Sequence, residues 1–328
     1  MLGGKPWHQS CNFPRAGVGL HHLRILNRNE LGHPFSVYGF YDGNYLRTKN
    51  FLLTNRMATG LTYGLKKHNP LDSIPNDVIG TRLNAFIELG LGIGLRINDL
   101  FYLEPGFRFS HFSNGNMRKP QRGINVASYD ISIRTMLSNQ KITPVKMCLD
   151  KCPHRHEWVG FVAASTRQIE FRDEDNTMRN AYDMNYLMAN LNLGYLYEAT
   201  RRLKLGGGFD FIYDGINGQQ EAAFRTGIPM RGSVPLRDKL ALAFFVGGES
   251  AIDKLSIVGT LGYVVAQRRF QYSTPRFEQR LGFKYHFYRN VFAGVNIRAY
   301  NFRAAKAVEF NVGFRKTLSL GGVRSGNL

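Results

Sequence analysis

Phe277-Glu-Gln-Arg-Leu-Gly-Phe-Lys-Tyr-His-Phe-Tyr288 is followed, after Arg289-Asn290, by Val291-Phe-Ala-Gly-Val-Asn-Ile-Arg-Ala-Tyr300. In both segments apolar or aromatic residues alternate with polar, charged or small ones. A period of two places successive side chains on opposite faces of a β-strand, and a two-residue break between two such runs predicts a tight hairpin. One face of each predicted strand is apolar, and the other carries charges and glycine.

The same alternation recurs in four further segments that end at turn-forming residues: Leu203–Asp214, Leu255–Val265, Val308–Arg315 and Leu103–Ser113. Some connections are tight, whereas others are long and polar, a combination typical of outer-membrane barrels. The mixed face suits a water-lined interior, and the apolar face suits lipid. We therefore predict an all-β fold, a transmembrane antiparallel up-and-down β-barrel of about 12–14 strands. Because no linker or low-complexity segment is visible, residues 1–328 are expected to form a single domain.

The composition agrees with a sheet protein, since the chain has 35 glycines, 24 phenylalanines and 16 tyrosines. A membrane-spanning helix needs about 20 largely apolar residues. The longest candidate, Leu83 to Leu95, is shorter and contains Glu88. The sequence therefore excludes a helical membrane protein.

The formal net charge of +19 calls for an anionic partner, either a nucleic acid or a membrane rich in phosphate head groups. Nucleic-acid binders usually gather Lys and Arg in one patch or stripe. Here these residues are scattered along the chain, so we expect a membrane and no nucleic acid as partner.

Three cysteines are too few for a disulfide scaffold. Cys148, Cys152, His154 and His156 could supply metal ligands, but one residue between the histidines is fewer than a zinc site usually has. We therefore expect a loop disulfide or free thiols, no metal and no cofactor. The first eight residues lack the apolar core of a signal peptide, so the chain is a mature form or the export hypothesis is wrong.

Polar side chains interrupt the apolar face of one predicted hairpin. By parity, His111 and Ser113 share a face with Phe107 and Phe109, and Asn125 lies on the apolar face of the next strand. If the strands pair so that His111 faces Asn125, a hydroxyl, an imidazole and an amide converge on the outer wall, as a nucleophile, a base and an orienting group do. Glu104 and Asp130 fall on the opposite face.

The residues His111-Phe-Ser113-Asn114-Gly115, with Pro120 and Gly123-Ile-Asn125, resemble the signature of the outer-membrane lipid A 3-O-deacylases, also called acyloxyacyl hydrolases. Pro6 to Arg15, Asn69-Pro70, Asn76 and Ile79-Gly80 are similar to longer bacteroidete-type members. The resemblance covers roughly residues 5 to 135. It implies an outer-membrane enzyme whose partner is lipid A, or lipopolysaccharide, and which removes the acyl chain esterified at position 3.

In that family pattern His111 is the general base and Ser113 the nucleophile, and a glutamate stands where this chain has Asn125. An amide orients an imidazole but does not stabilise its charged form as a carboxylate does. The backbone N–H groups at Asn114 and Gly115, with the Asn114 amide, are the expected oxyanion donors. Arg118, Lys119 and Arg122 are expected to bind lipid phosphates.

Two alternatives remain open at the sequence level: a non-enzymatic outer-membrane barrel, either a channel or a structural protein, and a soluble β-sandwich that binds anions. An interior filled by large side chains would favour the enzyme over a channel. The sequence leaves open whether the protein is a monomer or a homodimer.

Overall fold

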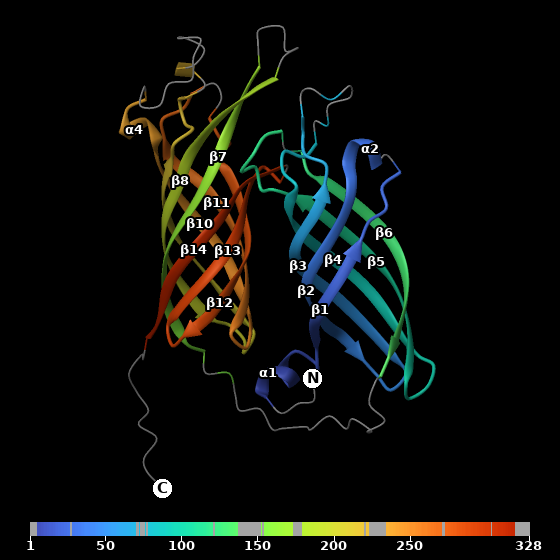
Figure 1. The fold of residues 1–328 in the computed structure, drawn as a ribbon. Helices are drawn as coiled ribbons and strands as arrows, with labels where there is room; N and C mark the ends of the chain where they lie inside the picture. The colour runs from blue at the N-terminus through green and yellow to red at the C-terminus, as the bar shows by residue number, and fades with distance from the viewer. Residues whose placement is uncertain are drawn as a thin grey trace, which may run out of the picture. The chain divides into compact units, whose positions relative to one another are not determined.

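The computed structural model describes residues 5–26, 28–69, 72, 76, 78–120, 122–136, 152, 154–172, 179–219, 221–222, 234–270, 273–302 and 304–318. Antiparallel strands dominate this part of the chain (Figure 1). Short helices in the described ranges include α1 (Pro6–Ser10), α2 (Arg28–Leu31) and α4 (Leu236–Lys239). No helix among the described residues is both long and apolar enough to cross a membrane.

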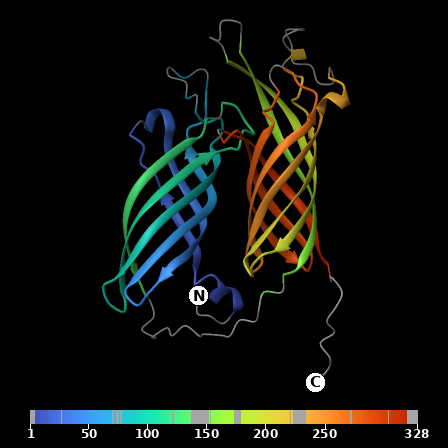
Figure 2. The same cartoon turned by 180° about the vertical axis from the view of Figure 1, so that it is seen from behind.

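The chain divides into two compact units, Met1–Asp150 and Lys151–Leu328. The first contains a six-stranded sheet in which each strand pairs with the next, so that β1 and β6 are its edges (Figures 1 and 2). Its strands are β1 (Arg15–His22), β2 (Gly32–Arg47), β3 (Phe51–Leu65), β4 (Leu83–Arg96), β5 (Phe101–Ser113) and β6 (Ile124–Thr135).

The six-stranded sheet curls around a packed interior. Phe86 of β4 and Phe112 of β5 are fully buried, with ring centroids 5.3 Å apart, and His21 of β1 stacks on Phe86. Nearer the opposite end, Glu104 of β5 forms ion pairs with Arg15 of β1 at 2.8 Å and with Arg134 of β6 at 2.7 Å. The interior face therefore carries aromatic rings toward one end and paired charges toward the other.

The second unit is a closed eight-stranded barrel in which β7 completes the circle by pairing with both β14 and β8. Its strands are β7 (His156–Arg172), β8 (Arg179–Glu198), β9 (Leu203–Asp214), β10 (Leu240–Ile252), β11 (Leu255–Gln267), β12 (Phe277–Tyr288), β13 (Val291–Tyr300) and β14 (Ala304–Leu318).

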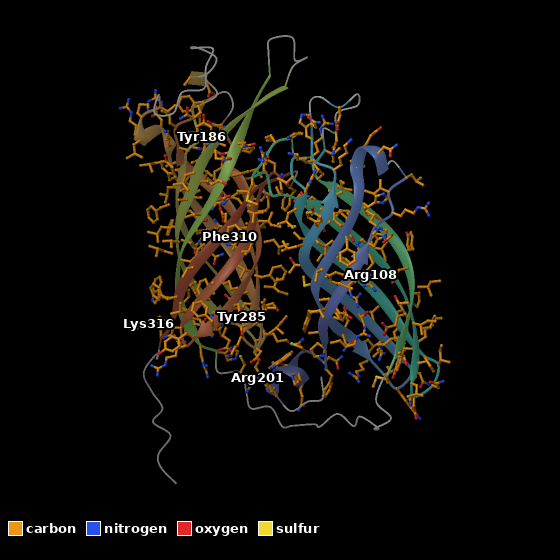
Figure 3. The ribbon with its side chains drawn as sticks, viewed as in Figure 1. Arg108, Tyr186, Arg201, Tyr285, Phe310 and Lys316 are labelled. Carbon is orange, nitrogen blue, oxygen red and sulfur yellow. The ribbon has the colours of Figure 1, made fainter. Side chains whose placement is uncertain are left out.

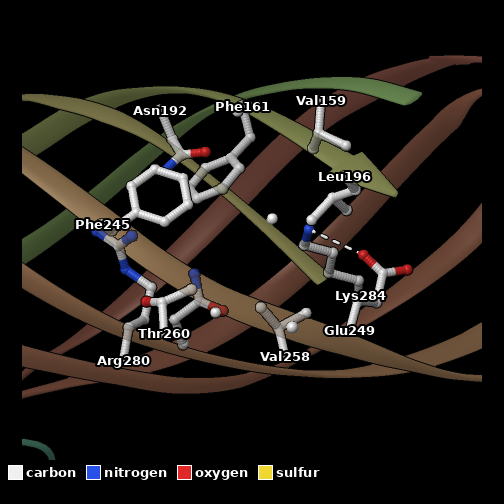
Figure 4. A pocket seen from close by; sticks show the side chains of 15 residues that line it. Val159, Phe161, Asn192, Leu196, Phe245, Glu249, Val258, Thr260, Arg280 and Lys284 are labelled. Atoms are coloured by element: carbon white, nitrogen blue, oxygen red, sulfur yellow. Dashed lines mark hydrogen bonds and ion pairs between the residues drawn. The ribbon is translucent and has the colours of Figure 1, made fainter. Parts of the chain in front are cut away.

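Paired charges fill the interior of this barrel. Arg298 is fully buried and lies 2.8 Å from Glu309, 3.5 Å from Glu278 and 3.5 Å from Asp210. Lys284 and Glu249 form a second pair at 3.3 Å beside a small cavity of about 30 Å³ (Figure 4). A barrel of eight strands is just wide enough for side chains to fill it, and each buried charge here has an opposite neighbour.

Apolar side chains cover the outward faces of both units. In the closed barrel Tyr285 and Phe310 are 51% and 57% exposed (Figure 3), and in the sheet Tyr129 and Ile131 are 89% and 77% exposed. The alternation read from the sequence thus separates a lipid-compatible surface from a polar interior, and the all-β barrel prediction is confirmed.

The distribution of strands differs from the single barrel expected over residues 1–328. The described residues contain fourteen strands, at the upper end of the expected range, but eight close a barrel and six form a separate sheet. Alternation specifies which face of a strand is apolar, and it does not specify which strand follows another around a barrel.

The loops at the two ends of the sheet in the first unit differ in length. The connections β2–β3, from Arg47 to Phe51, and β4–β5, from Arg96 to Phe101, are short. The connections at the other end, β3–β4 and β5–β6, run from Leu65 to Leu83 and from Ser113 to Ile124. His111 and Ser113 lie at the end with the long loops.

Candidate active site

The hairpin of β5 and β6 brings together the residues singled out from the sequence. The strands pair so that His111 lies opposite Asn125, which is the register that the sequence analysis assumed. Both side chains are on the outward face with the exposed Phe107 and Phe109. Parity therefore placed them correctly.

A hydrogen bond joins the two side chains, with 2.6 Å between Nδ1 of His111 and Oδ1 of Asn125. An amide oxygen only accepts, so Nδ1 carries the hydrogen and donates it. In the neutral imidazole the lone pair then lies on Nε2. Asn125 thus sets the tautomer that a general base acting through Nε2 requires.

Gly123 lies directly against the imidazole ring of His111. Its φ is +72°, and a Cβ built on it would lie 2.8 Å from Cε1 and 3.5 Å from Nε2 of His111. Any side chain here would both strain the backbone and displace the ring. Gly123 is part of the motif that ends at Asn125, but its contact with the imidazole is not predictable from the sequence, where a glycine two residues before Asn125 is the only signal.

Ser113 is the last residue of β5 and is 7% exposed. It pairs with Ala85 of β4, while His111 pairs with Ile87. Two residues along a strand separate the Cα atoms of His111 and Ser113 by about 6.6 Å on the same face. Among the described residues no hydrogen bond joins Oγ of Ser113 to His111. Such contacts are often long before substrate binds.

The β5–β6 loop begins with Asn114 and Gly115, the expected oxyanion donors. The Asn114 side chain is 3% exposed and donates from Nδ2 to the carbonyl oxygen of Arg118 at 2.9 Å, so it holds the loop together. Gly115 has a φ of +63° and is buried. A hydrolase would therefore draw its oxyanion contacts mainly from the backbone N–H groups, and the Asn114 side-chain role stays a prediction.

Carboxylates near the hairpin face the interior, as parity predicted. Glu104 is paired with Arg15 and Arg134, Asp130 lies 3.1 Å from Arg108, and Glu88 accepts a hydrogen bond from Ser110 at 3.2 Å. In the part of the chain that the structure describes, Asn125 is the hydrogen-bond partner of the His111 ring.

Two protein-family models match the chain, one in each unit. Residues 54–134, spanning most of β3 to β6, match the family model described as lipid A 3-O-deacylase (PagL). Residues 156–317, the closed barrel, match the model described as acyloxyacyl hydrolase, C-terminal domain. The chain belongs to this family. The match over residues 54–134 includes His111, Ser113 and Asn125.

No curated protein is significantly similar to the chain. Solved structures similar to it include the ferric enterobactin receptor of Pseudomonas aeruginosa in a mutant form (12% identity, TM-score 0.23, 87% of this chain and 43% of the receptor). A second is the alcaligin receptor of Bordetella pertussis (11% identity, TM-score 0.24, 92% of this chain and 61% of the receptor). A third is the toluene transporter TodX of Pseudomonas putida (7% identity, TM-score 0.22, 93% of this chain and 85% of the transporter). The chain spans 43% and 61% of the length of the two receptors.

The motif of Cys148, Cys152, His154 and His156 is described only in part, because Cys148 lies outside the described residues. His154 contacts the Glu198 carbonyl oxygen at 3.1 Å, and His156 contacts the hydroxyl of Tyr195. Within the described ranges no three His, Cys, Asp or Glu side chains are grouped to hold a metal ion.

Proposed function

We propose that this protein is a serine ester hydrolase of the outer membrane that removes the acyl chain esterified at position 3 of lipid A. The observation that carries the proposal is the hydrogen bond between His111 and Asn125 on an outward apolar face, two residues from Ser113. Ser113 is the nucleophile, His111 the general base and Asn125 the residue that orients the base.

The chemistry begins when Oγ of Ser113 attacks the ester carbonyl carbon and Nε2 of His111 takes the hydroxyl proton. The carbonyl oxygen becomes an oxyanion, for which the backbone N–H groups of Asn114 and Gly115 are the donors. Collapse of this intermediate breaks the bond to the sugar oxygen, which receives the proton from His111. Water then attacks the acyl-serine with His111 again as base, and releases a fatty acid and free Ser113.

The small neighbours of Ser113 favour access for a bulky lipid. Ala85 flanks the serine on one side and Gly123, without a side chain, lies by the imidazole. Ile87 lies opposite His111 on β4, and Phe109 lies two residues before His111 on β5. Both continue the apolar surface beside the imidazole. An acyl chain entering sideways from the bilayer would meet this surface before its ester reaches Ser113.

The placement of the site along the sheet supports action on an external lipid. In bacterial barrels short turns face the periplasm and long loops face the outside. Ser113 lies at the long-loop end of its sheet, so the orientation predicted by loop length puts it at the outer surface, where lipopolysaccharide is found. The filled interior of the closed barrel also favours an enzyme over a channel.

The test uses the full chain in mixed micelles with lipid A, and mass spectrometry of the lipid products. We expect loss of a single acyl group from position 3, with the matching free fatty acid, and no loss with Ser113→Ala. Loss from another position would reject the positional assignment, and full activity of Ser113→Ala would reject the serine mechanism.

A further inference from the structure

Described residues of the β3–β4 loop line a hollow of about 410 Å³ that is partly open to solvent. Its lining residues are mostly cationic or polar: Lys66, Lys67, His68, Asn69, Asp72 and Arg82. We call it the cationic hollow. It is separate from His111 and Ser113, and neither the family match nor the catalytic chemistry gives it a role.

Two of its positive charges have no acidic partner among the residues that the structure describes. Lys66 lies 2.9 Å from Asp72, and the hydrogen bond from the Lys66 ammonium holds the pKa of Asp72 below its ordinary value, so this pair is neutral overall. Lys67 and Arg82 are exposed and form no ion pair with any described residue. The described lining of the hollow therefore presents two cations without an acidic partner to an incoming ligand.

The loop is held in place by a buried side chain. Asn76 is 5% exposed, donates from Nδ2 to the Lys66 carbonyl oxygen at 2.6 Å and accepts from the Val78 N–H at 2.7 Å. His68 donates its backbone N–H to the Ile79 carbonyl oxygen at 2.7 Å. The cationic hollow is thus a built feature of the fold and not a chance meeting of exposed lysines.

The same loop packs against the loop that carries the candidate site. Ile79 is completely buried in one cluster with Phe112, and the Arg122 N–H donates to the Val78 carbonyl oxygen at 3.0 Å. Arg82 precedes Ala85, the partner of Ser113, by three residues. That spacing amounts to about 10 Å along a strand, a separation that a disaccharide head group can bridge.

We propose that the cationic hollow binds a phosphate group of the lipid A head group while the ester lies at Ser113. Lys67 would act as a point charge, and Arg82 would pair with two phosphate oxygens through its guanidinium. This inference rests on the proposed function, which it deepens by naming what holds the head group. These residues position the substrate and take no part in bond breaking.

The test measures binding of lipid A to detergent-solubilised full-length protein by isothermal titration calorimetry. All proteins carry Ser113→Ala, so that turnover does not alter the ligand. Bis-phosphorylated and fully dephosphorylated lipid A are compared for this background, for added Lys67→Gln with Arg82→Gln, and for the control Lys49→Gln. Lys49 is an exposed lysine in the short β2–β3 turn at the other end of the sheet.

We expect the double substitution to raise Kd for phosphorylated lipid A about tenfold, as two exposed charge contacts would, and to leave Kd for the dephosphorylated lipid within about twofold. The Lys49→Gln control should match the background for both lipids. Equal Kd values for the double variant and the background on phosphorylated lipid A would overturn the proposal. Displacement of the lipid by an equal concentration of inorganic phosphate would also overturn it, since the hollow would then be a free-phosphate site.

Turnover of the protein with native Ser113 separates the two proposals. If it releases no acyl chain while binding still depends on phosphate and on Lys67 and Arg82, the catalytic proposal is wrong and the hollow stands. If it deacylates lipid A while the double variant binds like the background, the hollow alone is wrong.

Discussion

One hydrogen bond determines which nitrogen of His111 can act as a base. Asn125 accepts from Nδ1 at 2.6 Å, so Nε2 is left with its lone pair on the outward face. A glutamate at this position would do the same and would also stabilise the imidazolium that the proposed mechanism forms on His111. Asn125 therefore supplies orientation without charge.

Replacing Asn125 at this position separates orientation from charge. Asn125→Ala should lower kcat for lipid A deacylation by up to about ten-thousandfold, the cost of the wrong tautomer in a serine protease. Asn125→Glu should keep activity or raise it. Initial rates in mixed micelles provide the measurement, and equal rates for the wild type and both variants would remove Asn125 from the site.

Gly123 gives a second residue-scale prediction. A methyl group here would lie 2.8 Å from Cε1 of His111, and the φ of +72° adds strain of about 1–2 kcal/mol. Gly123→Ala should therefore lose most of its activity while remaining folded. Gly39→Ala is the matched control, because a Cβ in that strand of the same sheet meets its nearest neighbour at 3.9 Å. Activity of Gly123→Ala equal to that of the control would contradict the proposed packing.

At the scale of elements, the sequence predicted β5 and β6 well and the loops poorly. Alternation placed His111, Ser113 and Asn125 on one face, and the assumed register agrees with the pairing in the structure. The contact of Gly123 with the imidazole and the bond from Asn114 to Arg118 depend on backbone turns with positive φ. No periodic pattern encodes such turns, so these details required the structure.

The β3–β4 loop permits a prediction about one such turn. Asn76→Ala leaves the half-buried Val78 N–H and the Lys66 carbonyl oxygen without their partner, which should cost about 1–2 kcal/mol. Hydrogen exchange at Val78 and Ile79 should accelerate, and lipid A binding should weaken. Asn98→Ala, which removes a similar cap from the short β4–β5 turn, should lose stability without changing binding. Equal binding by both variants would contradict the link between this loop and the substrate.

On the scale of the whole molecule, the fourteen strands carry two different interiors behind similar apolar surfaces. The curled sheet has an aromatic interior next to its candidate site. The closed barrel has an interior of buried charges that stabilise one another only as a set. Which strands enclose which interior is decided by tertiary pairing, and alternation alone could not predict it.

Arg298 tests the charge network of the closed barrel. Arg298→Met would leave Glu278, Glu309 and Asp210 less compensated, so the folded barrel should lose about 3–5 kcal/mol. The temperature at which the unboiled, fast-migrating band disappears from a gel reports this loss. Phe310→Leu on the outward face of β14 serves as the control and should behave like the wild type. An unchanged transition temperature for Arg298→Met would show that the network contributes little.

Covalent labelling tests the catalytic assignment most directly. An alkyl fluorophosphonate forms a bond to the oxygen of an activated serine and releases fluoride. Mass spectrometry of the detergent-solubilised protein should find one phosphonyl group, located on Ser113. The label should be absent from Ser113→Ala and should form much more slowly in Asn125→Ala. A label on another serine, or a Ser113→Ala protein that still deacylates lipid A, would contradict the account.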